Sequence, residues 1–290
     1  MITATLRMAS LRMDIGKGII SAILLASFVQ STALRAEPLS DSAPLDRGYR
    51  QMYNLQFSEA HRTFESYAVA HPDDPMAPVS DAAAFLFSEF DRLKILQSDF
   101  WIEDQPFLDF HKPPADPAIK KQFETAIAKA QRLVAVALKK NPDDANAELA
   151  DTLRLGLSAD YLALIEKKQM AGLTVVKQSR QEAERLLARH PEQYDAWIAV
   201  ALENYLLSLK SGPVRWLLRM GGAQTDKTVG IEKMEITAEK GHYLLPYARL
   251  LLAVADLRNH LPSHAKAKLQ WLAKEFPGNR LYREELAKLN

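Results

Sequence analysis

The feature that most constrains the fold of this chain is a group of three residues that recurs four times at fixed spacing. In each group a proline is preceded twelve residues earlier by a small residue and eight residues earlier by an apolar or small one. The first two positions share a helix face, where the small residue lets a neighbouring helix approach closely. The proline ends that helix, because it cannot donate a backbone hydrogen bond. The four groups are Ala60/Phe64/Pro72, Ala130/Val134/Pro142, Ser179/Ala183/Pro191 and Ala265/Leu269/Pro277.

The hydrophobic pattern of the rest of the chain predicts an all-α fold. Only 11 of the 290 residues are glycine, and apolar residues recur at three- and four-residue steps without the alternation typical of strands. One helix is expected to follow residues 141–144 and to run to about residue 170, and another to cover 178–189, before a helix that begins near Trp197. We expect the other helices near 45–55, 58–70, 76–96, 118–140, 214–220, 227–240, 243–259, 262–275 and 279–289.

The N-terminal segment has the layout of a secretory signal peptide. Basic residues at Arg7, Arg12 and Lys17 precede an apolar run over 19–29, and small residues follow before position 37. We therefore expect residues 1–36 to be a signal peptide, 37–44 a flexible tether, and the mature chain to be periplasmic or secreted. An uncleaved N-terminal anchor is the alternative, although the apolar run is short for a membrane span.

The charge balance disfavours one class of partner. The chain holds 37 basic and 36 acidic residues, and removing the four basic and one acidic residues of 1–36 leaves 33 against 35. Nucleic-acid binding normally requires a basic face, so we do not expect it. The chain has no cysteine, which excludes disulfides and a lipid-modified cysteine, and membrane association is not favoured.

Two irregular insertions interrupt the helical pattern. The first, residues 98–117, combines four prolines with Trp101, Phe107 and Phe110. A disordered linker seldom carries so many aromatic residues, so we expect an ordered loop. These aromatic residues could pack onto the helices of the chain itself. Alternatively, they could bind a partner or roof a pocket for a small ligand.

The second insertion lies near 212–224, where the body of the chain could divide into two parts. A short amphipathic helix there carries Arg215, Trp216 and Arg219, which could meet an acidic partner or lipid headgroups. The simpler interpretation is a connector in which Trp216 and its two leucine neighbours are buried. On the preceding helix, Asn204 and Tyr205 are candidates to face a binding groove.

The spacing of the small, apolar and proline residues resembles that of tetratricopeptide-repeat proteins. Ala77, Ala147 and Ala196 each follow a proline by five residues, and Gly48 precedes Pro72 by twenty-four, as in that family's first helix. The four prolines are 70, 49 and 86 residues apart, so the repeats are uneven. The resemblance implies a right-handed solenoid of antiparallel helix pairs over 45–290, whose concave groove binds a protein or peptide without catalysis.

No motif in the chain supports a catalytic, cofactor or metal site. Residues 221–228 nearly match a phosphate-binding loop, but Asp226 replaces the required second glycine. Pro262 separates His260 from His264, which argues against a shared helix face for a metal. We therefore expect an exported, non-catalytic scaffold that binds a protein or peptide. The alternative is a small-ligand carrier or enzyme whose pocket is roofed by 98–117.

Overall fold

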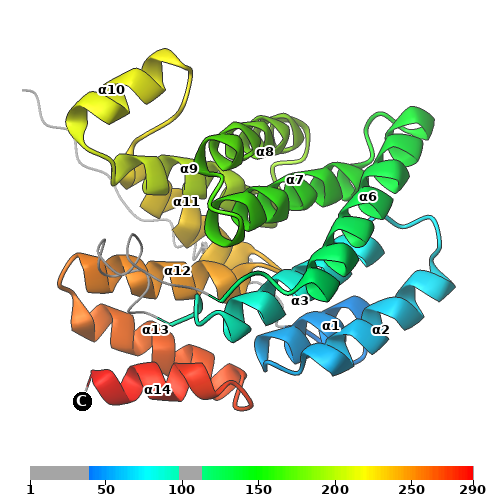
Figure 1. The fold of residues 1–290 in the computed structure, drawn as a ribbon, viewed down its shortest axis with the longest axis horizontal. Coiled ribbons are helices and arrows are strands. Elements are labelled where there is room, and N and C mark those ends of the chain that lie inside the picture. Colours follow the sequence, from blue (N-terminus) through cyan, green and yellow to red (C-terminus); the bar gives the residue numbers. More distant parts are fainter. Residues whose placement is uncertain (1–38, 98–112, 290) are drawn as a thin grey trace, which may run out of the picture. The chain divides into compact units, whose positions relative to one another are not determined.

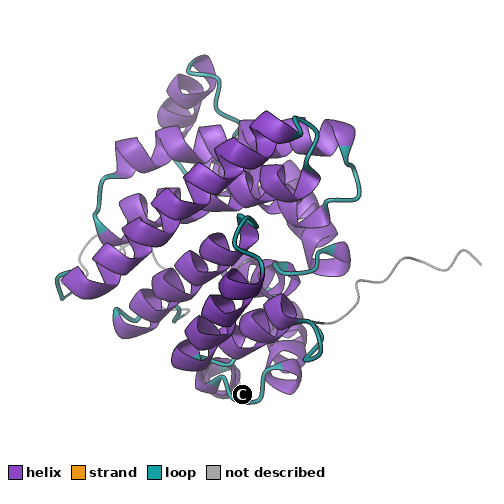
Figure 2. Cartoon of the chain, turned by 90° about the vertical axis from the view of Figure 1, so that its right-hand side faces the viewer, coloured by secondary structure: helices purple, strands orange, loops and turns teal. Residues whose placement is uncertain are grey.

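A computed structural model describes residues 39–97 and 113–289 of the chain (Figure 1). These residues belong to one compact unit that spans 34–290. Within the described ranges every regular element is a helix, and Figure 2 shows these helices joined by short loops without a strand. The prediction of an all-α fold is confirmed. None of the described helices is long and apolar enough to cross a membrane.

Most helices contact the next helix along the chain, whereas α11 packs on α9 rather than on α10. The first part contains α1 (Pro44–Tyr53), α2 (Phe57–Ala70), α3 (Met76–Arg92), α6 (Pro117–Lys140), α7 (Ala145–Asp160) and α8 (Gln169–Arg189). A π-helical turn, η1 (Tyr161–Ile165), extends α7, and a 3-10 turn, η2 (Tyr194–Ala196), precedes α9. The second part contains α9 (Trp197–Ser208), α10 (Gly212–Met220), α11 (Lys227–Lys240), α12 (Leu245–Arg258), α13 (Pro262–Glu275) and α14 (Arg280–Lys288).

The spacing that opened the sequence analysis marks the contact faces of four helices. The small residue of each group is 0–2% exposed, and the position four residues later is also buried in all four helices. The four helices, α2, α6, α8 and α13, each end two residues before their proline. The pattern therefore predicted both where these helices pack and where they stop.

Two glycines allow helices to touch at distances that a side chain would prevent. A Cβ atom on Gly48 of α1 would overlap the ring of Phe64 on α2. A Cβ atom on Gly230 of α11 would lie 2.7 Å from the backbone nitrogen of Tyr205 on α9. Since a Cβ atom essentially never lies so close to backbone, these positions fix the pairs α1/α2 and α9/α11.

Helix boundaries agree with the sequence predictions where proline, glycine or a capping residue marks them. The bounds of α11 and α13 were predicted to the residue, and Asp226 caps α11 by accepting from the amides of Thr228 and Val229. The boundary between α7 and α8 was predicted wrongly. Met170 lies in the first turn of α8, which begins nine residues before the expected start. The chain reverses after Ile165 with a left-handed residue, Lys167 (φ 57°), rather than at a glycine or proline.

The first helix of the unit contacts its C-terminal part. The hydroxyl of Tyr53 donates to the carbonyl oxygen of Tyr243 at 2.8 Å, and the amide of Asn279 donates to the carbonyl oxygen of Tyr53 at 2.9 Å. The guanidinium of Arg50 binds the carboxylate of Glu275 at 2.7 Å. These bonds tie α1 to residues about 190 to 230 positions later in the chain.

Aromatic stacking and a buried carboxylate strengthen the same contact. The rings of Tyr49 and Tyr243 stack with their centroids 4.6 Å apart. Asp195 accepts hydrogen bonds from the backbone amides of His242, Tyr243 and Leu244, and so holds the segment that Tyr49 and Tyr53 contact. Burial raises the pKa of Asp195, and the three amides oppose that effect. The helices of the unit are thus joined into a closed arrangement around a common interior.

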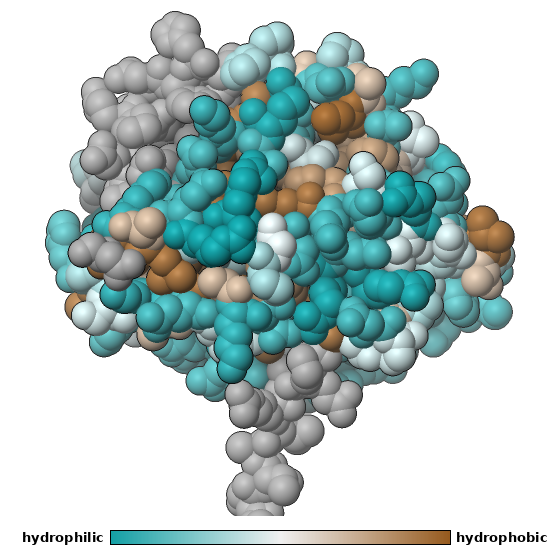
Figure 3. Space-filling view, turned by 90° about the horizontal axis from the view of Figure 1, so that it is seen from below, coloured by the Kyte–Doolittle hydropathy of each residue, from teal (hydrophilic) through white to brown (hydrophobic). Residues whose placement is uncertain are grey.

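The surface of the unit is mainly polar on the face that Figure 3 shows. That face is seen from below in the orientation of Figure 1, and hydrophobic residues form only small patches on it. Large apolar side chains lie instead between the helices. The exceptions with the greatest consequence are on α10.

Candidate functional site

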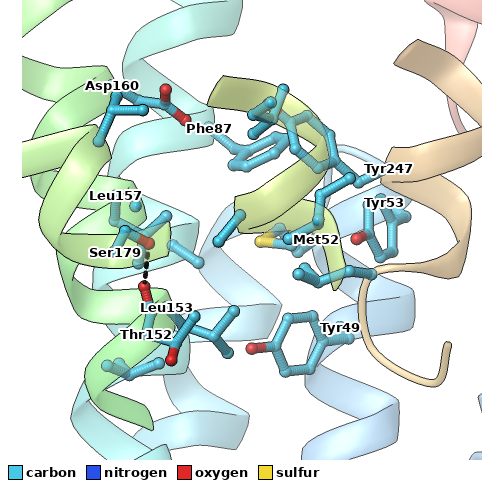
Figure 4. Close-up of a pocket in the computed structure, with 18 of the residues that line it drawn as sticks. Tyr49, Met52, Tyr53, Phe87, Thr152, Leu153, Leu157, Asp160, Ser179 and Tyr247 are labelled. Carbon is cyan, nitrogen blue, oxygen red and sulfur yellow. Dashed lines mark hydrogen bonds between the residues drawn. The ribbon is translucent and has the colours of Figure 1, made fainter. Parts of the chain in front are cut away.

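A cavity of about 80 Å³ lies in the interior that the closed arrangement surrounds (Figure 4). Its walls come from α1, α3, α7, α8, α9 and α12, the first and last of which are far apart in the sequence. The lining is predominantly apolar and aromatic, with a few polar groups, which is the usual character of a small-molecule site. The labelled lining residues in Figure 4 are Tyr49, Met52, Tyr53, Phe87, Thr152, Leu153, Leu157, Asp160, Ser179 and Tyr247.

One face of α7 supplies the polar groups of the cavity. Thr152, Gly156 and Asp160 are spaced four residues apart, so they lie in line on the side that borders the cavity. The rise of an α-helix places the first and last of them about 12 Å apart. Gly156 between them has no side chain, and a Cβ atom there would meet only the hydroxyl of Ser179, at 3.7 Å. The cavity therefore has room at its centre and a polar group towards each end.

The carboxyl group of Asp160 is placed unusually for an acidic residue. The residue is half-buried, and its carboxyl group lies towards one end of the cavity, near Phe87 in Figure 4, with no hydrogen-bond or ion-pair partner among the described residues. Burial without a compensating partner disfavours the charged form, which raises the pKa of Asp160 from 3.8 to about 7. Near neutral pH this carboxyl group can be present in either form.

The other end of the cavity holds a second polar atom without a partner. The hydroxyl of Thr152 is fully buried and makes no hydrogen bond within the described structure. Its neighbour Ser179 does not supply one, because the hydroxyl of Ser179 donates to the backbone oxygen of Thr152 at 2.9 Å. An unpaired buried hydroxyl costs about 1–3 kcal/mol, so a group that bonds to it would be favoured there.

Aromatic rings form the wall opposite α7. Tyr247 of α12 meets Phe87 of α3 edge to face, with ring centroids 5.6 Å apart. Burial, and to a lesser degree the negative charge of Asp160, raise the pKa of Tyr247 well above its usual value, so its hydroxyl stays protonated. Tyr49 and Tyr53 continue this wall along α1. The electron-rich faces of such rings attract cations as well as apolar groups.

The lining can bind a ligand through one carboxyl group and the hydroxyls of three tyrosines, which are its titratable side chains. Its residues include one carboxyl group and no histidine, lysine, arginine or cysteine. In the described parts of the chain no group of three or more His, Cys, Asp or Glu residues could hold a metal ion.

Comparison with known proteins does not assign the chain to a family. No protein-family model, no curated protein and no solved structure matches it. The site must therefore be interpreted from its own geometry.

None of the candidate residues that the structure describes lines this cavity. Trp101, Phe107 and Phe110 lie outside the described residues, as does most of the insertion 98–117. Asn204 is buried, and its side-chain amide bonds to Gln224 and accepts from the backbone amide of Asp226. It thereby fastens the segment after α10 to α9.

Tyr205 is also buried, because it packs against Gly230 of α11, and its hydroxyl has no partner in the described structure. Neither Asn204 nor Tyr205 presents a surface to a partner. Both side chains serve the packing of α9 against the segment and the helix that follow α10.

The three candidates on α10 are placed differently. The sequence analysis favoured a connector with Trp216 and Leu217 buried, and this expectation is wrong. Trp216 is 63% exposed and Leu217 is 65% exposed, and α10 has no buried residue. Arg215 and Arg219 bond instead to neighbouring backbone and hydroxyl oxygens of the chain.

The cavity residues were missed because their signal is spread across the chain. Thr152, Gly156 and Asp160 do form a local pattern, a polar stripe with a gap on an otherwise apolar helix face. That stripe could have been recognised from the four-residue spacing. Its aromatic partners Tyr49 and Tyr247 are nearly 200 positions apart, and only the closed arrangement brings them together.

Proposed function

We propose that the chain is a small-molecule binding protein whose ligand occupies the central cavity. The observation that carries the proposal is the pairing of an apolar, aromatic lining with two unpartnered polar groups, the hydroxyl of Thr152 and the carboxyl group of Asp160. Buried polar groups are normally satisfied, and an exception is explained by a ligand that completes the set. The proposed role is binding or carriage without catalysis.

The closed arrangement favours this role over the expected peptide groove. A groove between the first helices of each pair would need exposed inner faces. The inner residues of α1 and α3, among them Tyr49, Met52 and Val79, are instead at most 2% exposed, and α1 is bonded to residues 243–279. A preformed cavity is the feature that distinguishes a ligand carrier from a scaffold.

The cavity favours a ligand with an apolar body and an amine at one end. A cationic amine near Asp160 would stabilise the ionised carboxylate and remove the penalty that raises its pKa. The rings of Phe87 and Tyr247 border the same region and suit an apolar or aromatic body.

An arrangement of helices like that of tetratricopeptide-repeat proteins and an exported location are further parts of the proposal. The first is supported by the buried register of Ala60, Ala130, Ser179 and Ala265 and by the contact of Gly48 with α2. The second is supported by the sequence pattern of residues 1–36, which lie outside the described residues.

The test uses propylamine, an amine small enough for a cavity of about 80 Å³, as a probe and calorimetry on three proteins. The unaltered chain is expected to bind the probe. Gly156→Leu is expected to abolish binding, because the added side chain projects into the cavity from a position with room for it. Gly212→Leu is the matched control on α10, where nothing lies within 4 Å, and it is expected to bind normally.

Failure of the unaltered chain to bind the amine, or equal binding by Gly156→Leu, would contradict the proposal. If Gly156→Leu does not fold, Gly156→Ala provides a milder obstruction and is expected to weaken binding severalfold while keeping the helix intact.

A further inference from the structure

The exposed helix α10 turns its apolar side to the solvent, which is the reverse of a helix packed on the surface of a globular protein. A helix on a globular protein normally turns its apolar side inward and its charged side to solvent. In α10 the apolar residues Trp216, Leu217 and Met220 are 63%, 65% and 68% exposed. No residue of α10 is buried. The helix therefore presents an apolar ridge outward, and Figure 1 shows it at the margin of the helices that pack together.

The arginines of α10 are used to hold the helix in this orientation. Arg215 donates to the backbone oxygens of Ser208 and Lys210 at 3.1 and 2.9 Å. Arg219 donates to the hydroxyl of Thr225 at 2.6 Å. All these acceptors are neutral, so no carboxylate in these contacts offsets the positive charge of the two guanidinium groups.

The charge near α10 has one sign. Residues 204–225 contain Lys210, Arg215 and Arg219 but no acidic residue. Asp226 follows directly and caps α11, and two acidic residues of the preceding helices, Glu184 and Glu203, are both paired with Arg180. The apolar ridge is thus accompanied by a net positive charge that the described residues do not neutralise.

We propose that α10 docks on an anionic lipid surface, with its apolar ridge inserted at the level of the headgroups. Tryptophan, leucine and methionine beside arginine and lysine are the chemistry of interfacial helices, and basic residues draw such a helix to anionic lipid. Three residues, Trp216, Leu217 and Met220, insert, while the ammonium group of Lys210 meets the lipid phosphates and the positive charge of the two arginines attracts the anionic surface.

Two other occupants fit the observations less well. A second copy of the chain would bring two sets of three basic residues together, and like charges across an interface are unfavourable. A protein partner would need its own groove to receive the ridge. A lipid interface is deformable and anionic, so it accommodates both the ridge and the charge.

The experiment measures vesicle binding by the chain from Glu37 onward, which keeps every described residue but not the apolar segment 19–29. Vesicles of phosphatidylcholine alone are compared with vesicles containing about 30% phosphatidylglycerol, at about 50 mM salt, by co-sedimentation. Binding is expected for the anionic vesicles and is expected to weaken steeply as salt is raised.

Two double variants separate the ridge from apolar exposure in general. Trp216→Ala with Leu217→Ala is expected to weaken binding about tenfold or more. Val69→Ala with Val136→Ala removes two equally exposed apolar side chains on α2 and α6 and is expected to leave binding unchanged. Since none of these side chains is buried, all variants are expected to fold, which circular dichroism checks.

A charge variant completes the test. Lys210 is exposed, and its ammonium group makes no hydrogen bond or ion pair within the described structure, so Lys210→Gln keeps the backbone oxygen that anchors Arg215. It is expected to weaken binding to anionic vesicles about fivefold. Equal binding to both vesicle types, no binding at 50 mM salt, or unchanged binding by the α10 double variant would each overturn the proposal. So would a Trp216-dependent dimer seen by sedimentation velocity without lipid.

Discussion

The inner face of α7 and the outer face of α10 use apolar residues in opposite ways. On α7 the apolar residues enclose a cavity, and the polar exceptions, Thr152 and Asp160, lie within it. On α10 the apolar residues are exposed, and the arginines bond to the body of the unit. In each region the side chains that break the usual inside–outside rule mark the proposed site. The comparison also indicates that the two sites are independent, since α10 contributes no residue to the cavity.

The largest expected difference between the two regions is in stability. Tyr49→Ala removes a ring that is 1% exposed, stacks on Tyr243 and lines the cavity, so we expect a loss of about 3–5 kcal/mol in the free energy of unfolding. Trp216→Ala removes a larger ring that is not buried, and its cost should stay within about 0.5 kcal/mol. Urea unfolding followed by circular dichroism measures both. Similar losses would mean that α10 is packed as tightly as α1.

The second prediction concerns the pH dependence of stability in the cavity region. Asp160 has a folded-state pKa of about 7 against 3.8 in the unfolded chain, so the folded state binds the proton more tightly. The contribution of Asp160 to the free energy of unfolding is most favourable below about pH 4. It is lost as pH rises through about 7, by on the order of 3 kcal/mol. Asp160→Asn should remove this part of the dependence.

Unfolding free energies at pH 4.5 and pH 8 provide the measurement, compared between the unaltered chain and Asp160→Asn. The comparison cancels other titrating groups, including Asp195, whose pKa is also raised. An identical pH dependence in the two proteins would show that the carboxyl group of Asp160 is solvated rather than enclosed.

A smaller effect on stability is expected when glycine is replaced by alanine, at Gly156 in the cavity region and at Gly212 on α10. Gly156→Ala adds a methyl group where the nearest atom would be 3.7 Å away, so the gain in helix propensity should stabilise the fold by about 0.5–1 kcal/mol. Gly212→Ala, at the first position of α10, should have less effect because that position is not in the helix interior. Thermal unfolding compares them. Destabilisation by Gly156→Ala would indicate that the centre of the cavity is closed.

Local patterns in the sequence were sufficient for most of the fold. Proline and a small residue at fixed spacing act within one helix, and so Ala60, Ala130, Ser179 and Ala265 were placed correctly on buried faces. The same reasoning failed between α7 and α8, where the reversal depends on Lys167 in a left-handed conformation. Lysine carries no turn signal in a single sequence.

The candidate sites were beyond the reach of such patterns for two physical reasons. The cavity exists because bonds such as that from Tyr53 to Tyr243 close the helices around it, and contacts this distant leave no periodic trace. The exposure of Trp216 could not be inferred, because an amphipathic helix looks the same in sequence whichever side it turns to the protein. Only the neutral acceptors of Arg215 and Arg219 reveal the orientation.

The most direct test of the central claim, that the cavity binds an amine through Asp160, is the affinity for propylamine at pH 6 and pH 8. The amine is a cation at both values, whereas a carboxyl group with a pKa of about 7 is mostly neutral at the first and mostly ionised at the second. We predict that the affinity rises about tenfold between pH 6 and pH 8, and that this rise is absent in Asp160→Asn. An affinity that does not change with pH in the unaltered chain would contradict the account.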